Sequence, residues 1–247
     1  MNVGIFDSGA GGLSVLKSIL NENLFENIFY YGDTARVPYG VKDKETIIKF
    51  SLEALDFFKQ FKLDMLIIAC NTVSAYALKE LRKKADFPVL GVIDAGVNAT
   101  KNALCNLNDE ILVLATKATI NSKQYENRLK KEGFVNVKSL ATGLFVPVVE
   151  EGIFNGKIVQ SLFEYYFKDI SKQPEAIILG CTHFPLLSDA LKKYFGKNTK
   201  LIHSGDAISY ELKDKFKLKR LNKKPKIEFY ASSDVKALKE TAKLWLK

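Results

Sequence analysis

The sequence predicts an α/β protein with two similar parallel-sheet domains, related by pseudo-symmetry, and an active site at their interface. Short apolar runs rich in β-forming residues alternate with helix-like stretches, which favours a mostly parallel sheet with helices on both faces. The alternation starts again around Asp94. Two segments at corresponding places, LIIACNTVSA (66–75) and IILGCTHFPLL (177–187), share an apolar strand, a small residue, a cysteine and a polar pair that includes threonine.

In the first half, apolar runs of strand length are separated by stretches with helical periodicity. Residues 44–61 are expected to form a helix, because apolar residues such as Ile47, Leu55 and Phe58 recur near the 3.6-residue spacing. Residues 64–69 form a short, mostly apolar run that is typical of a buried strand. The predicted strands of this half are 2–6, 28–32, 64–69 and 89–92, and the predicted helices are 11–21, 44–61 and 74–84.

The second half repeats this alternation and is followed by a last helix–strand–helix segment. Its predicted strands are 110–115, 135–140, 176–179 and 201–203, and its predicted helices are 98–103, 121–131, 155–167 and about 185–194. The last segment is expected to contain a helix at 207–216, a strand at 227–231 and a helix from about 235.

The repeat also predicts where the domains divide. A strand with a polar turn precedes each cysteine segment, in GIFDSGAGG (4–12) and LVLATKATI (112–120); Asp7 lies 63 positions before Cys70, and Thr116 lies 65 before Cys181. We expect one domain to comprise residues 1–92 plus 206–247, with Cys70, and the other residues 93–205, with Cys181. Because ligands bind at the carboxyl ends of strands in such sheets, both cysteine turns are expected at the interface.

Composition narrows the classes of protein. The chain has 247 residues, 47% hydrophobic and 26% charged, with no low-complexity tract, as expected for a globular protein. The start, MNVGIFDSGAGG, has no basic region typical of a secretory signal, and no run approaches the roughly 20 apolar residues of a membrane helix. We therefore expect a cytoplasmic protein that does not contact a membrane.

Cysteine count and charge point to free thiols and a basic surface. Three cysteines without CxxC or Cys/His spacing predict neither a disulfide framework nor a zinc site, and we expect no metal. The net charge of +9 comes largely from a lysine-rich segment at 213–226. A basic surface can bind nucleic acid or attract an acidic substrate, but a solvated face is the more ordinary interpretation.

The two matched cysteines are the first candidates for chemistry. Cys70 and Cys181 each end a strand and open a polar turn, Asn71–Thr72 and Thr182–His183. A thiol at a helix N-terminus is expected to have a lowered pKa, which makes it more reactive. One such cysteine is more often a small buried hydrophobe, but two at matching positions of a repeat favour function. Cys105 lacks this setting and is interpreted as structural or incidental.

Three further segments carry polar groups at loop positions. Asp7 precedes Ser8 and a glycine-rich turn whose spacing does not fit a dinucleotide fingerprint, so its carboxylate suits an ammonium group or a thiol partner; a helix-capping role is the alternative. Tyr39 and Gly40 end a polar loop of the kind that often binds ligands. His183 lies two residues after the second cysteine and can set its protonation.

Glu150 follows an apolar run in VPVVEEG (146–152), with a second acid, Glu151, next to it. Either acid can equally be exposed and without a function. His203 has no neighbouring motif, and no role is predicted for it.

Five motifs together resemble the glutamate racemases of the aspartate/glutamate racemase family. They occur in order in DSGAGG (7–12), YGDTARVPYG (31–40), ACNTVSA (69–75), VPVVEEG (146–152) and GCTHFPLL (180–187), and the resemblance extends from residue 1 to about 205. It implies a two-domain α/β architecture. The sequence departs from many relatives at Asp94–Ala95–Gly96, where they carry Glu-Pro-Gly, and at His203, where they carry Asp. Neither departure falls on a motif that carries chemistry.

The resemblance implies the roles of the candidate residues. Cys70 and Cys181 are the acid/base thiols; in the family the first takes the proton from D-glutamate and the second from L-glutamate. Asp7 is implied to assist Cys70, and His183 and Glu150 to assist Cys181. The implied substrate-binding residues are Asp7, Ser8, Tyr39, Gly40, Asn71, Thr72, Thr182 and His183.

The expected function is therefore that of an isomerase without a cofactor, which interconverts L- and D-glutamate and supplies D-glutamate for peptidoglycan, the cell wall and cell shape. A homodimer is typical of the family. Aspartate racemase uses the same thiol pair and is one alternative; a dicarboxylate-binding protein without catalysis is another. Some relatives affect DNA gyrase, so a secondary interaction with gyrase or nucleic acid, through the basic segment, stays open as a weaker possibility.

Overall fold

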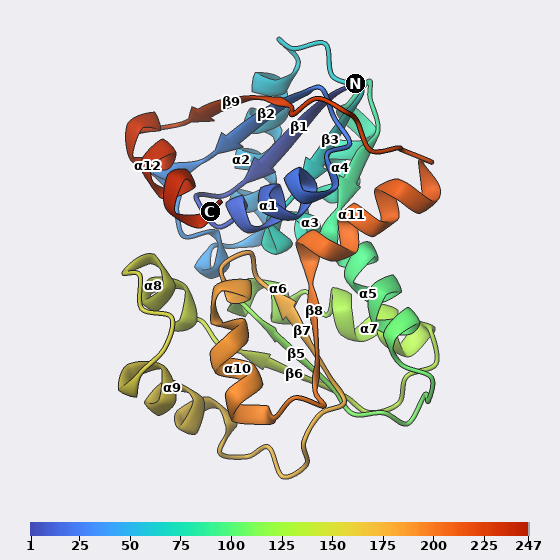
Figure 1. The fold of residues 1–247 in the computed structure, drawn as a ribbon, viewed down its shortest axis with the longest axis vertical. Coiled ribbons are helices and arrows are strands. Elements are labelled where there is room, and N and C mark those ends of the chain that lie inside the picture. Colours follow the sequence, from blue (N-terminus) through green and yellow to red (C-terminus); the bar gives the residue numbers. More distant parts are fainter. Residues whose placement is uncertain (247) are drawn as a thin grey trace.

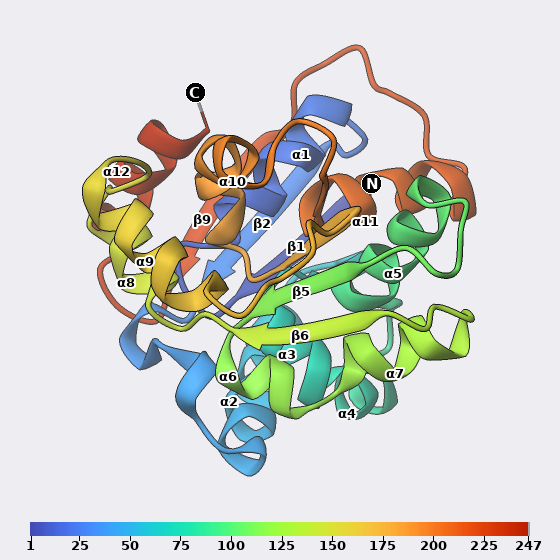
Figure 2. The same ribbon diagram turned by 90° about the horizontal axis from the view of Figure 1, so that it is seen from below.

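The computed structural model describes residues 1–246 and contains two parallel β-sheets, each placed between layers of helices (Figures 1 and 2). The spatial order of strands is β4–β3–β1–β2–β9 in the first sheet and β6–β5–β7–β8 in the second. The strands are β1 (Asn2–Asp7), β2 (Asn27–Gly32), β3 (Met65–Ile68), β4 (Val89–Gly91), β5 (Ile111–Ala115), β6 (Val137–Ala141), β7 (Ala176–Gly180), β8 (Lys200–His203) and β9 (Lys226–Ala231).

The two sheets share one topology. Read in reverse, the second sheet runs β8–β7–β5–β6, which matches β4–β3–β1–β2 of the first. β1 pairs with β2 on one side and β3 on the other, and β5 pairs with β6 and β7 in the same way. This confirms the predicted pair of similar parallel-sheet regions. The strand β9, which pairs with β2, has no counterpart in the second sheet.

The strands β3 and β7, which lead to the two cysteines, contain no polar side chain because helices cover both of their faces. Every residue of β3 and of β7 is buried. Parallel strands covered on both sides lose the alternation of polar and apolar residues that a half-exposed strand shows. The sequence signal for these strands is therefore a continuous apolar run, followed at once by a cysteine.

Helices cover both faces of each sheet, and a separate hydrophobic core forms on each face. The first sheet packs against α1, α5, α11 and α12 on one face and against α2, α3 and α4 on the other. The second packs against α8, α9 and α10 on one face and against α5 and α7 on the other. The helices are α1 (Leu13–Glu22), α2 (Lys44–Phe58), α3 (Asn71–Tyr76), α4 (Leu78–Lys84), α5 (Val92–Ala103), α6 (Lys117–Asn121), α7 (Gln124–Lys131), α8 (Phe145–Glu150), α9 (Lys157–Phe167), α10 (Ser188–Phe195), α11 (Ser204–Lys215) and α12 (Val235–Trp245), with 3₁₀ turns η1 (Thr34–Arg36), η2 (Tyr39–Val41) and η3 (Phe184–Leu187).

Several helices differ from their predicted extents. The helix predicted for 74–84 begins at Asn71, directly after the first cysteine, and is interrupted at Ala77. The helix predicted for 98–103 begins already at Val92. The β-branched residues Val92 and Ile93 favour a strand, and the strand predicted for 89–92 includes the first of them, but tertiary packing places both in the helix. The stretch predicted as one helix at 121–131 is divided between α6 and α7, and the 44–61 helix ends at Phe58.

The two halves meet along α5 and α11. Residues of α5 belong to the cores of both halves, since Val92 packs with the first and Ile93 with the second. Residues of α11 pack in the core of the first half, and at the start of this helix the Ser204 hydroxyl donates to the Leu179 carbonyl of β7 in the second half at 3.3 Å. The residue limits of the two domains stay a prediction. Within residues 1–246, no helix combines the length and apolar character needed to cross a bilayer.

Candidate active site

A cavity of about 410 Å³ lies between the two halves, at the carboxyl ends of the central strands. This is a typical volume for a small-molecule site. Its walls contain ten of the eleven residues singled out from the sequence, which are Ser8, Tyr39, Gly40, Cys70, Asn71, Thr72, Glu150, Cys181, Thr182 and His183. Asp7, the eleventh, does not line the cavity and lies buried behind its wall.

Cys70 follows β3 and stands directly before α3, with its side chain almost fully buried. Its Sγ lies 3.5 Å from Ser8 Oγ. Burial and the charge of Asp7 raise the pKa of the Cys70 thiol to about 12. The lowered pKa expected from the helix N-terminus is therefore wrong for this residue, since desolvation and a nearby carboxylate outweigh the favourable contacts of a six-residue helix.

Asp7 is fully buried at the end of β1. The Gly9 N–H donates to its Oδ2 at 3.0 Å, and Thr182 Oγ1 donates to its Oδ1 at 3.4 Å. Burial raises the pKa of Asp7, while the charge of His183 acts in the opposite direction. The turn after Asp7 needs glycine at Gly12, because a Cβ built there would lie 2.5 Å from the Asp7 Cβ.

On the other side of the cavity, Cys181 follows β7 and its Sγ lies 3.7 Å from His183 Nδ1. The opposite ring nitrogen, Nε2, lies 3.1 Å from Glu150 Oε1. Burial lowers the pKa of His183, but its hydrogen bonds with Cys181 and Glu150 outweigh burial and bring the pKa to about 10. At neutral pH a protonated imidazolium therefore lies beside this thiol, where it stabilises negative charge on sulfur.

Glu150 reaches this site from the end of α8, a helix formed by the apolar run of the VPVVEEG motif. Its side chain is 45% exposed and lines the cavity, whereas Glu151 is exposed and is not part of the lining. Of the two adjacent acids, the structure thus brings only Glu150 into contact with His183.

The turns after the cysteines make contacts across the two halves. The Tyr125 hydroxyl of α7 donates to Asn71 Oδ1 at 2.7 Å. Thr72 Oγ1 lies 3.0 Å from the Thr116 hydroxyl and 3.1 Å from the Thr119 hydroxyl. These bonds fix the turn after Cys70 against elements of the second half, so the arrangement of the cavity depends on how the halves are docked.

Thr116 and Lys117 also line the cavity and were not among the residues singled out. The repeat carries a signal for Thr116, because it aligns with Asp7 at the end of the first strand of its half. Lys117 follows Thr116 and places a cationic side chain in the lining, which is suited to attract a carboxylate. Among residues 1–246, no group of three or more His, Cys, Asp or Glu side chains is arranged to hold a metal ion.

Comparisons with known proteins agree with the architecture and the motifs. The family model described as Asp/Glu/Hydantoin racemase matches residues 12–209. Curated glutamate racemases of Campylobacter jejuni and Helicobacter acinonychis are 66% and 51% identical to the chain; the matches cover all of this chain and 98% and 100% of theirs.

Solved structures are similar over the whole chain. The crystal structure of glutamate racemase from Campylobacter jejuni has a TM-score of 0.98 at 66% identity, covering 100% of this chain and 98% of that one. Glutamate racemase from Francisella tularensis, solved in complex with D-glutamate, has a TM-score of 0.87 at 35% identity and covers 99% and 93%. A family model that spans most of the chain and relatives similar over their full length lead to one conclusion: the chain belongs to the Asp/Glu/Hydantoin racemase family.

Proposed function

We propose that this chain is a glutamate racemase, which inverts the Cα of glutamate with Cys70 and Cys181 and needs no cofactor. One observation carries the proposal. Two thiols stand at matching ends of β3 and β7, and both line the same cavity between the two halves. Inversion requires a base on one face of Cα and an acid on the other, and a repeated α/β unit supplies the same group from both sides.

The reaction is a proton transfer on each face of the substrate. One cysteine, as a thiolate, removes the Cα proton of glutamate, and the other, as a thiol, delivers its proton to the opposite face. The product is the other enantiomer, and the two sulfurs have exchanged their protonation states. Ser8, Thr72 and Thr182 line the cavity, and we infer that hydroxyls and backbone N–H groups at their turns stabilise the negative charge that develops on the substrate.

The charges around the two sulfurs suit opposite roles. In the absence of ligand, the raised pKa of Cys70 keeps it protonated at neutral pH, ready to act as the acid. Cys181 lies beside the His183 imidazolium and acts as the base, with Glu150 holding the imidazole. This state is suited to L-glutamate; with D-glutamate the roles reverse, and Asp7 assists Cys70.

The biological setting belongs to the same proposal. We infer that D-glutamate made by the enzyme serves peptidoglycan synthesis, that the enzyme acts in the cytoplasm and that it works as a homodimer. Light scattering of the purified protein tests the dimer, because a mass near that of one chain would contradict it. The 27.7 kDa mass of the chain sets the reference.

The first experiment follows the circular dichroism of D-glutamate and, separately, of D-aspartate with purified protein and no added cofactor. Racemisation of D-glutamate alone is expected. Cys70→Ser and Cys181→Ser are each expected to lower kcat by about 10³-fold or more, within the range of lost acid–base catalysis. Cys105→Ser is the matched control, because Cys105 is an exposed free cysteine outside the cavity lining, and it is expected to retain activity.

Racemisation of D-aspartate instead would keep the mechanism and change the substrate. No reaction of folded protein with either amino acid would overturn the proposal and favour a binding protein. Full activity of either active-site serine variant would refute the two-thiol mechanism while leaving the substrate assignment in place.

A further inference from the structure

The loop between β2 and α2 forms one wall of the cavity. Residues 37–41 of this loop all line the cavity and include Tyr39 and Gly40. Tyr39 is almost fully buried, although it lies in a loop without regular secondary structure beyond two short 3₁₀ turns. A loop with this role needs groups that hold it in place, because a displacement of even about 0.5 Å changes a binding geometry.

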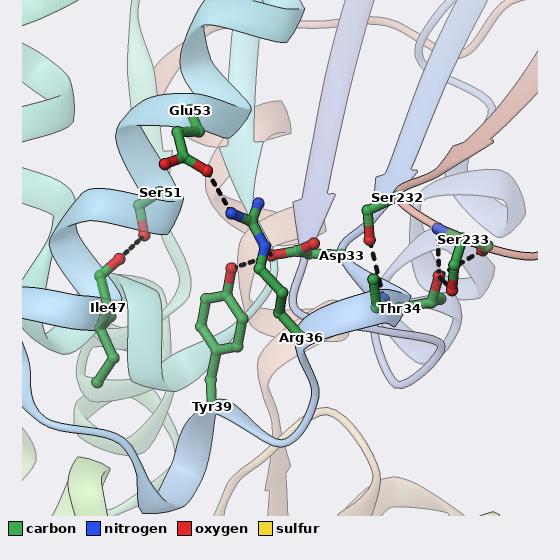
Figure 3. Close-up of polar contacts among 10 residues, drawn as sticks. Asp33, Thr34, Arg36, Tyr39, Ile47, Ser51, Glu53, Ser232 and Ser233 are labelled. Atoms are coloured by element: carbon green, nitrogen blue, oxygen red, sulfur yellow. Dashed lines mark hydrogen bonds and ion pairs between the residues drawn. The ribbon is translucent and has the colours of Figure 1, made fainter.

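Asp33, at the start of this loop, is a fully buried carboxylate. Its backbone N–H donates to Asp7 O at 3.1 Å, so the loop begins beside the end of β1. Its Oδ2 accepts hydrogen bonds from Arg36 Nε at 2.7 Å and from the Tyr39 hydroxyl (Figure 3). Within residues 1–246, its Oδ1 has no hydrogen-bond partner. A buried charge is costly unless it is paired, so this carboxylate strongly favours the loop conformation that brings both donors to it.

The Arg36 side chain is in turn fixed by α2. It forms an ion pair with Glu53 (Figure 3). Its guanidinium carbon also lies 4.1 Å from the centre of the Phe50 ring. Arginine can contact two carboxylates and an aromatic face at once because its donors form a planar fork. Asp33 is therefore linked through Arg36 to the body of the first half.

The other partner, Tyr39, keeps its proton. Burial and the hydrogen bond to Asp33 raise the pKa of the Tyr39 phenol above its ordinary value, so the hydroxyl remains a donor over the physiological range. Directly after Tyr39, the chain approaches the second half. A Cβ built at Gly40 would lie 2.6 Å from Thr116 Cβ. The position of Tyr39 thus sets how closely this wall approaches the opposite side of the cavity.

We propose that Asp33 is a positioning residue for the substrate pocket. Through its bonds to Arg36 and Tyr39, Asp33 holds the segment 36–41 in place. The inference rests on the proposed function, because it concerns the same pocket. Asp33 is not among the lining residues, so it acts on substrate only through the loop. The thiols, Asp7 and His183 come from other elements, so loss of the Asp33 charge is expected to weaken substrate binding more than the proton transfers.

The first test needs no substrate. In Asp33→Asn, a neutral amide replaces the acceptor of both donors, and the amide hydrogens of residues 34–42 are expected to exchange about tenfold faster than in the parent. The matched control is Asp43→Asn, at the exposed far end of the loop, where the side chain caps α2 and asparagine caps as well as aspartate. Unchanged exchange in Asp33→Asn would overturn the proposal, whether or not the protein racemises glutamate.

The second test uses the racemisation assay. Asp33→Asn is expected to raise KM for glutamate about tenfold, since bonds to a charged group are lost, and to lower kcat by less than about threefold. Asp43→Asn is expected to keep KM within about twofold of the parent. A larger fall in kcat than rise in KM would refute the positioning role.

A double-variant cycle tests whether Asp33 acts through Tyr39. Tyr39→Phe removes the hydroxyl but keeps the ring, and the variant with both substitutions is expected to raise KM no more than the larger single effect. Additive effects would contradict the proposal. Should Asp33→Asn fail to fold, Arg36→Lys tests the same contact. Lysine keeps the positive charge but lacks the planar group of donors that arginine presents to Asp33. Unchanged KM and unchanged amide exchange of the loop in Arg36→Lys would overturn the inference.

Discussion

The two cysteine turns share a position in the fold but not a chemical environment. In the first half, the strand beside Cys70 ends at Asp7, a carboxylate; in the second half, the strand beside Cys181 ends at Ala115 and is followed by the neutral Thr116. The imidazolium of His183 lies beside Cys181, with 3.7 Å between its Nδ1 and the Cys181 Sγ. The comparison shows that repetition of the fold places the two sulfurs, whereas a few side chains give them different charges.

Thermodynamics limits how far this difference between the two sides can show in the kinetics. L- and D-glutamate have equal free energies in water, so kcat/KM is the same in both directions for the parent and for every active variant. A substitution on one side of the site therefore lowers kcat/KM equally for both enantiomers. Any asymmetry between the two halves has to be sought in kcat and KM measured separately for each direction, or in the stability of the protein.

Among substitutions that leave both thiols in place, the largest effect is expected from the pair at the ends of β1 and β5. Asp7→Asn removes a buried charge beside Cys70 and is expected to lower kcat about 10²-fold, in the range of general acid–base assistance. Thr116→Val removes a neutral hydroxyl bonded to Thr72 and is expected to lower kcat by about tenfold or less. Circular dichroism assays started from each enantiomer measure both. Equal losses in the two variants would mean that the halves do not differ in the way described.

An intermediate effect concerns His183 and the stability of the fold. The pKa of His183 is raised to about 10 from 6.5, so its protonation stabilises the folded protein fully below about pH 6.5, and this contribution is lost as the pH rises through about 10. The free energy of unfolding of the parent is therefore expected to exceed that of His183→Asn by roughly 2 kcal/mol more at pH 6 than at pH 10.

Urea unfolding of both proteins at these two pH values measures the His183 difference. A difference that grows with pH would show that the imidazole is neutral in the folded state. In that case the charge contrast between the two cysteine turns would rest on Asp7 alone.

The smallest effect is expected at Glu150. Its carboxylate is half exposed, so solvent screens its attraction for His183, and Glu150→Gln is expected to lower kcat by about threefold. Its exposed neighbour provides the control: Glu151→Gln changes the same charge without touching the cavity and is expected to match the parent. A loss in Glu150→Gln as large as that in Asp7→Asn would place the main electrostatic contribution on the Cys181 side.

Elements that carry a local signal in the sequence could be predicted from the sequence alone. The continuous apolar runs of β3 and β7, each followed by a cysteine and a polar pair, predicted the strand ends and the position of the cavity. The helix limits were less well predicted: α5 begins six residues before its predicted start, at residue 98, because packing between both cores overrides the weak helical propensity of Val92 and Ile93.

The bonds between the halves had no signal in the sequence. Thr72 meets Thr116, and Asn71 meets Tyr125, only because the two units dock in one orientation, which periodicity does not specify. The pKa of Cys70 was mispredicted for a related reason. The helix N-terminus is visible in the sequence, but the degree of burial and the approach of Asp7 are properties of the assembled site.

The unmatched strand β9 has a consequence for how the chain behaves among other proteins. It covers β2, whose sequence NIFYYG contains no charged residue and would otherwise present free backbone groups at a sheet edge. Such an uncharged aromatic strand is a template for aggregation. The strand that replaces it at the border carries Lys226 and Glu228, paired with each other at 2.7 Å. The last segment of the chain thus replaces an uncharged edge strand, which favours pairing with another chain, by a charged edge strand, which disfavours it.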